Sequence, residues 1–261
     1  MSAGAHDMAS GSLSRQQVLD ELQFLATVEH ALIVEYLSVC CAFGHDLGPG
    51  EGGAATQQGR DVAEAAFNLA AGEMFHLKAV NSFLVDAGRP AQLGRATRLC
   101  SDSVAEIGLG PPSLAQLERA RERAAAIPSA VEERYARLRS AATDQAFEGD
   151  LLHKLQFLID QAGPHAAAFT TFRDVLGDLV PVELLRATLR DPADAFERRL
   201  LTVSDRSYGL VLAALREQFT QGDSSEAGAF RGLAISAMEG LRESHRVLVQ
   251  RGLLPRFTPP D

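Results

Sequence analysis

Residues 66–84 read AFNLAAGEMFHLKAVNSFL, and this stretch decides the predicted fold. Apolar and small residues recur in it every three or four positions, which is the spacing of one face of an α-helix. Glu73 and His76 are three residues apart and lie on that otherwise apolar face. The predicted inward stripe comprises Ala66, Leu69, Ala70, Glu73, His76, Leu77, Val80 and Leu84. The stretch therefore predicts a core helix with a carboxylate and an imidazole turned inward.

The pair Glu73 and His76 is a candidate metal site. A carboxylate isolated in a core is costly unless it is paired or binds a metal. The Glu-x-x-His spacing lets a carboxylate bridge metal ions while the imidazole binds one of them. The spacing alone occurs by chance on many solvent-exposed helices, so the apolar surroundings carry the prediction. Carboxylate and imidazole donors without a thiolate suit iron or manganese better than copper or structural zinc.

An earlier helix is predicted from the N-cap Ser14 to about Phe43, and it carries two inward carboxylates. Glu29 and Glu35 fall in neighbouring apolar rows, so periodicity does not choose between them, and one could instead pair with an arginine. His30 lies off both rows, either as a hydrogen-bond donor behind a metal ligand or at the surface. These polar residues argue against a membrane span, because charges at mid-bilayer are costly.

The whole chain predicts an all-α four-helix bundle with additional helices, because sustained alternation typical of strands is missing from the sequence. Gly163-Pro164 is expected to end one helix and open the next.

One domain is expected over 13–261, with a core at about 14–176 and C-terminal helices at about 195–251, after a disordered tail at 1–12. The other expected segments are a glycine-rich loop and candidate lid at 44–59 and helices at about 60–87, 113–126, 128–161, 164–176, 181–189, 195–220 and 226–251.

Composition narrows the class of protein. The 261 residues carry a formal net charge of −9 with a pI of about 5.3, which argues against a nucleic-acid partner. The first twelve residues lack the pattern of a secretion signal, so a cytoplasmic protein without a membrane partner is expected. Cys40, Cys41 and Cys100 match no disulfide or zinc framework and are expected to be buried thiols.

Three further polar residues are ambiguous from the sequence alone. Asp160 could be a ligand, a cap or a turn residue, and His165 could be a ligand or an exposed residue at a helix start. His245 lies on an apolar stripe, where a lone histidine is more often a core residue with satisfied hydrogen bonds than a metal ligand.

The segments Glu29-His-Ala-Leu-Ile-Val-Glu-Tyr-Leu, Gly72-Glu-Met-Phe-His-Leu-Lys-Ala-Val-Asn and Leu158-Ile-Asp-Gln-Ala-Gly-Pro-His resemble a known family. They are similar to the ferritin-like domain of the violacein-pathway iminophenylpyruvate dimer synthase and its relatives, over roughly residues 14–176. The resemblance favours Glu29 over Glu35, because the family's glutamate directly precedes a histidine. Asp160 stands where the family usually has Glu. The metal ligands that it implies are Glu29, Glu73, His76, Asp160 and His165.

The resemblance implies an iron-dependent enzyme, with one or two ions and manganese as an alternative metal. The expected reaction is oxidation or oxygenation of a small molecule by O₂ or peroxide, in natural-product biosynthesis. Tyr36 and His30 are the catalytic candidates, and Asn81 is expected beside them near the metal. The alternatives are a ferroxidase or iron-handling protein and a non-catalytic helical scaffold with a structural Glu73–His76 pair. A homo-oligomer is one candidate assembly.

Overall fold

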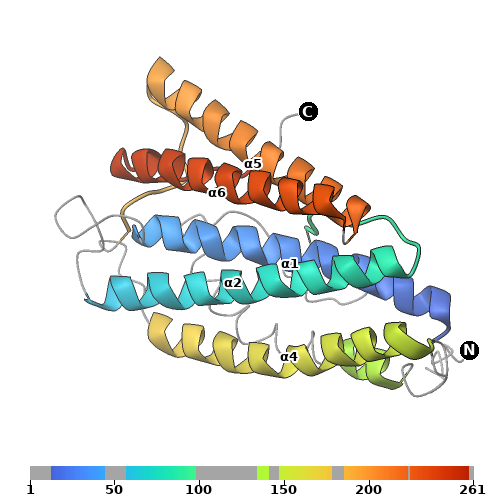
Figure 1. Ribbon diagram of the computed structural model, residues 1–261. Helices are drawn as coiled ribbons and strands as arrows, with labels where there is room; N and C mark the ends of the chain where they lie inside the picture. Colours follow the sequence, from blue (N-terminus) through green and yellow to red (C-terminus); the bar gives the residue numbers. More distant parts are fainter. Residues whose placement is uncertain are drawn as a thin grey trace, which may run out of the picture.

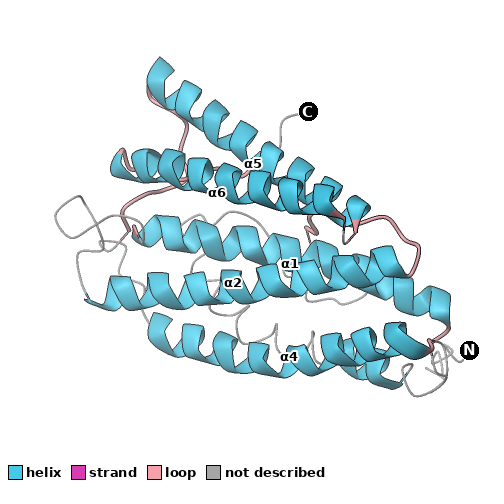
Figure 2. Cartoon of the chain, viewed as in Figure 1, coloured by secondary structure: helices cyan, strands magenta, loops and turns pink. Residues whose placement is uncertain are grey.

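The computed structural model describes residues 13–44, 57–97, 134–140, 147–177, 185–222 and 224–258, except the side chains of 161–166. Its five long helices are α1 (Arg15–Phe43), α2 (Gln57–Asp86), α4 (Gly149–Leu176), α5 (Ala195–Gln221) and α6 (Ser225–Gln250). Residues 134–140 form a further short helix. These ranges contain no β-strand (Figure 2), only one isolated bridge between Thr188 and Leu253. The all-α prediction is confirmed.

The helices are arranged in layers, as Figure 1 shows. α1 and α2 pack along each other and form the middle layer, and α4 packs against α2 on one side. α5 and α6 form a hairpin that covers the opposite side of the α1–α2 pair. The middle layer therefore has two buried faces, one toward α4 and one toward the hairpin.

Local signals set the ends of α1 as the sequence predicted. Ser14 and Gln17 form a capping box, with the Gln17 side chain accepting from the Ser14 backbone N–H at 2.8 Å. Gly44 ends the helix in the left-handed conformation with φ of 72°. By length and composition α1 could cross a membrane, but 83% of its most apolar window is buried inside the protein. That burial is typical of a core helix.

Several predicted helix boundaries were wrong, and at two of them the structure shows contacts with residues distant in sequence. α2 begins at Gln57, inside the predicted loop at 44–59. The expected helix at 128–161 is interrupted before α4, where Phe147 packs on Phe83 with ring centroids 5.4 Å apart. The described part of the expected helix at 181–189 is not helical. Its backbone bonds other segments instead, as where Arg186 N–H donates to the carbonyl of Ala42 at 2.6 Å.

Gly163-Pro164 does not break the helix, because α4 continues without interruption to Leu176. A proline inside a helix removes one backbone hydrogen bond. Buried apolar side chains on both sides of it, including Ile159 and Phe169, hold the helix against the bundle and offset that loss. The expected tail at 1–12, the helix at 113–126, Cys100 and nearly all of the 44–59 loop lie outside the described residues.

Glu197 ties the start of α5 to the end of α6. Its carboxylate accepts two bonds from Arg190, at 2.8 and 3.0 Å, and one from Arg251 Nε at 3.2 Å. The backbone N–H of Ala193 donates a further bond at 2.7 Å. These partners, Arg190 above all, lower the pKa of Glu197 from 4.5 to about 2.

The Glu197 ion pairs should make the stability of the protein pH-dependent. Their contribution is complete above the ordinary pKa of 4.5 and is lost as the pH falls toward about 2, because the unfolded chain takes up the proton first. Glu197→Gln should therefore lose less stability than the wild type on acidification from about pH 6 to about pH 3, measured as thermal midpoints by circular dichroism. Glu243→Gln, at an exposed glutamate of α6, is the control and should follow the wild type. Parallel curves for all three proteins would contradict this role.

Candidate metal centre

Three buried side chains from the two middle helices meet in the face that is turned toward α4. Glu29 comes from α1, and Glu73 and His76 come from α2. One donor atom of each lies within 4.8 Å of the others. None of the three residues is more than 3% exposed. The structure thus brings together three of the predicted ligands from positions far apart in the sequence.

The group lies between two apolar clusters of the core. On α2 one cluster ends at Ala70 and the other begins at Leu77, so Glu73 and His76 fall in the interval. On α4, Ile159 belongs to one cluster and Phe169 to the other. Apolar layers on both sides limit access of water to the three donors and make their charges costly without a counter-ion.

Burial raises the pKa of Glu73 well above its ordinary value of 4.5, and the nearby Glu29 carboxylate raises it further by charge and hydrogen bonding. Two carboxylates that share a buried site cannot both ionise at low cost. Without a cation, the preferred state is a protonated Glu73 that donates to Glu29. A divalent cation would take the place of that proton.

The donor set fits an iron or manganese ion. It consists of two carboxylates and one imidazole, with no thiolate, which is the chemistry that these metals accept. His76 Nδ1 lies 3.9 Å from Glu29 Oε1. Glu35 is equally buried but is not part of the group. Of the two glutamates on α1, Glu29 is therefore the one beside Glu73 and His76, as the family resemblance favoured.

Tyr135, on the short helix at 134–140, is a neighbour of the site that the sequence analysis did not identify. Its hydroxyl donates to Glu29 Oε1 at 3.5 Å, and its ring is 6.4 Å from the His76 ring. Burial and the charges of Glu29 and Glu73 raise the pKa of Tyr135 well above 10.0, so it remains a donor. The feature of the sequence that indicates a buried Tyr135 is its i, i+3 spacing from the apolar Leu138 within a highly charged segment.

His30 faces the opposite layer from the three donors. Its Nδ1 bonds the carbonyl of Leu93 at 2.9 Å, and its Nε2 bonds the hydroxyl of Tyr208 on α5. Burial lowers the pKa of His30 to about 4, so the ring is neutral. Because successive helical residues point about 100° apart, its neighbour Glu29 can face α4 while His30 faces the hairpin. The two ring nitrogens thus tie α1 to the segment after α2 and to α5, and the catalytic role of His30 stays a prediction.

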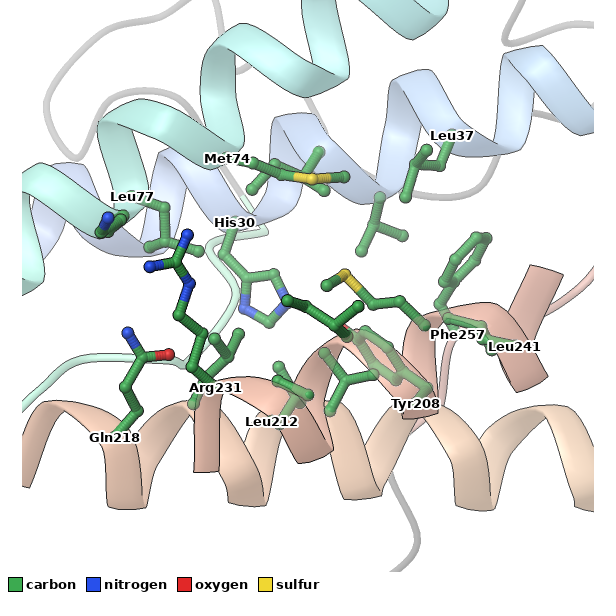
Figure 3. Close-up of a pocket in the computed structure, with 18 of the residues that line it drawn as sticks. His30, Leu37, Met74, Leu77, Tyr208, Leu212, Gln218, Arg231, Leu241 and Phe257 are labelled. Carbon is green, nitrogen blue, oxygen red and sulfur yellow. The ribbon is translucent and has the colours of Figure 1, made fainter. Parts of the chain in front are cut away.

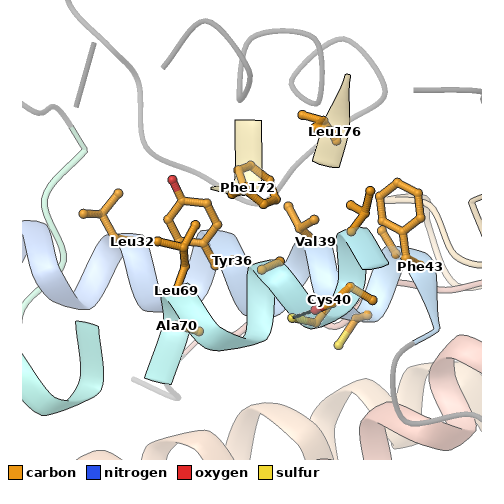
Figure 4. Close-up of a cluster of buried hydrophobic side chains, with 14 of the residues drawn as sticks. Leu32, Tyr36, Val39, Cys40, Phe43, Leu69, Ala70, Phe172 and Leu176 are labelled. Atoms are coloured by element: carbon orange, nitrogen blue, oxygen red, sulfur yellow. Dashed lines mark hydrogen bonds between the residues drawn. The ribbon is translucent and has the colours of Figure 1, made fainter. Parts of the chain in front are cut away.

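Tyr36 lies on the same face of α1 as Glu29, two turns and roughly 10 Å further along. Its ring packs edge-on against Phe172 of α4 at a centroid distance of 5.3 Å (Figure 4). Phe169 of the same helix packs on it at 5.8 Å. The structure thus gives Tyr36 a packing role, and its catalytic role stays a prediction. Asn81 holds the chain after α2, because it donates to the carbonyl of Gln92 and accepts from the N–H of the same residue.

The structure does not bring Asp160 into the group. Asp160 is exposed, while its neighbours Leu158 and Ile159 face the core, because the unbroken α4 helix keeps a constant phase through this region. The backbone of His165 is part of α4, but its side chain is outside the described part, so its ligand role stays a prediction. His245 is a core residue, bonded to Ser204 at 3.0 Å and packed on Phe257 at 4.7 Å.

The fold and site define a ferritin-like helical bundle with a candidate metal centre in its core. The sequence matches no family model and no curated protein. A solved ferritin-like protein from Caulobacter vibrioides has a similar fold, with a TM-score of 0.65, 13% identity, and coverage of 95% of this chain and 99% of that one. At that identity the likeness shows the fold alone, and it confirms the ferritin-like prediction.

Proposed function

We propose that this protein is a metal-dependent oxidase or oxygenase of a small organic molecule in the cytoplasm. The observation that carries the proposal is the buried Glu29, Glu73 and His76 group, whose donor atoms lie within 4.8 Å of one another. A bound iron or manganese ion would supply redox chemistry with O₂ or peroxide. The ferritin-like fold is compatible with such a centre, because facing helices of these bundles commonly hold carboxylate-bound metals.

The residues around the centre have separate tasks. Glu29 and Glu73 provide negative charge that balances the cation, and His76 provides a neutral nitrogen donor. Tyr135 donates to Glu29, which fixes the orientation of that carboxylate. The apolar clusters on both sides exclude bulk water, and a dry site limits side reactions of reactive species. The resemblance to the violacein-pathway family supports a small-molecule substrate from natural-product biosynthesis.

The proposal is tested by metal content and oxygen consumption. Protein purified with added iron and manganese should contain one or two ions per chain, and Glu73→Ala with His76→Ala should remove them while helical circular dichroism is retained. The iron-loaded protein should then consume O₂ only when an organic substrate is present; aromatic 2-oxo and 2-imino acids form the first panel. Fe(II) oxidation without an organic compound, in a large symmetric assembly, would instead indicate iron handling. No metal in the wild type after anaerobic Fe(II) loading would overturn the proposal.

A further inference from the structure

A second candidate site lies on the other side of the middle layer. α1, α2, α5 and α6 enclose a cavity of about 300 Å³. That volume is at the lower end of the range of ligand pockets, about 300–1,000 Å³. Most of the lining is aliphatic or aromatic, and none of the described residues that line it is acidic. Representative members of the wall are Ile33, Met74, Leu77, Leu212, Ala234 and Leu241.

The cavity is polar at one end only. Figure 3 shows Arg231 and Gln218 near Leu77 at one end, and Leu241 and Phe257 at the other. Lys78, which follows Leu77 on α2, also lines the cavity. Lys78 and Arg231 form no ion pair with any carboxylate in the part of the chain that the structure describes. Two cations at the end of an apolar cavity, in a chain of net charge −9, attract an anionic group.

The middle of the cavity does not require a polar partner. His30 and Tyr208 are its interior polar groups, and the tyrosine hydroxyl donates to the His30 Nε2. The other ring nitrogen of His30 already bonds the carbonyl of Leu93. A ligand body that passes these residues can therefore be fully apolar without leaving a buried donor unsatisfied.

We propose that this cavity binds an amphipathic organic anion, with its apolar body between the hairpin and the α1–α2 pair and its carboxylate at Lys78 and Arg231. The site goes beyond the proposed redox function and does not depend on it. The cavity residues His30, Met74 and Leu77 directly follow the three metal-site residues in sequence, but they face the other layer of the bundle. Metal-free protein therefore binds the anion as well as metal-loaded protein does.

Calorimetric titration of metal-free, full-length protein with decanoate and with decanol tests this site. The wild type should bind both compounds. Lys78→Glu with Arg231→Glu should weaken decanoate about tenfold, because the carboxylate then meets like charge, and should leave decanol within about twofold. Arg216→Glu, at an exposed α5 arginine outside the cavity, should leave both affinities unchanged.

A blocking variant tests the location. Ala234 is 1% exposed on the cavity wall, so Ala234→Phe should place its ring in the cavity and abolish both binding signals. Ala213→Phe, at an exposed α5 position outside the cavity, is the matched control and should bind normally. If Ala234→Phe does not fold, the charge variants decide alone. No decanoate binding by the wild type, or equal affinity in the charge-reversed protein, would overturn the proposal whatever the metal content proves to be.

Discussion

Glu73→Gln should abolish metal-dependent stabilisation of the protein and leave the metal-free chain folded. The amide keeps the size of the side chain and can still donate to Glu29, but it removes a buried carboxylate whose pKa is already raised by burial and by Glu29. A ligand present at a hundred times its Kd stabilises a folded protein by about 2.7 kcal/mol. For a chain of this length that corresponds to about 5–10 °C in the thermal midpoint. Melting curves with and without Mn(II), or anaerobic Fe(II), measure the difference.

Asp160→Asn provides a control on the third bundle helix. Because Asp160 is exposed on α4, this variant should keep the full metal-dependent shift. A shift in Glu73→Gln equal to that of the wild type would show that the Glu29, Glu73 and His76 group is not where the metal binds. Loss of the shift in Asp160→Asn would instead show that α4 turns this carboxylate inward when metal is bound, as the family resemblance implies.

The sequence predicted those features that depend on neighbouring residues. The bounds of α1 follow from a capping box at Ser14 and a left-handed glycine at position 44, and both signals lie within one turn of the ends. The Glu73–His76 pair could be found because its spacing and apolar neighbours belong to a single helix. Helical periodicity predicted that Glu29 and Glu35 are both buried, and both are 2% exposed or less. Periodicity could not show which of the two lies beside Glu73 and His76 of α2.

The features that were missed depend on contacts between segments distant in sequence. Tyr135 reaches Glu29 across 106 positions of the chain, and nothing in its own segment indicates that partner. His30 is held by Leu93 and Tyr208, which lie 63 and 178 positions away. The continuity of α4 through Pro164 likewise depends on packing against the bundle, which outweighs a local helix-breaking signal.

Phe172→Ala should destabilise the protein by about 3–5 kcal/mol, which is the usual cost of removing a fully buried phenyl ring. Phe172 has 0% exposure and packs on Tyr36 in the apolar cluster near the C-terminal end of α4 (Figure 4). Deletion of the ring leaves a cavity between α4 and the middle layer that rigid helices cannot fill. Urea unfolding followed by circular dichroism measures the change. Phe157→Ala, on the same helix but 48% exposed, is the matched control and should cost about 1 kcal/mol or less.

The Phe172 variant should also keep its metal, because the Phe172 ring packs on Tyr36, two turns along α1 from Glu29. Metal content measured at a temperature where the variant is folded checks this. The expected pattern is reciprocal: Glu73→Gln loses the metal but not the fold, and Phe172→Ala loses stability but not the metal. Loss of metal in folded Phe172→Ala would mean that the position of α4 controls the site. That result would point to a metal ligand on α4, with His165 as the candidate.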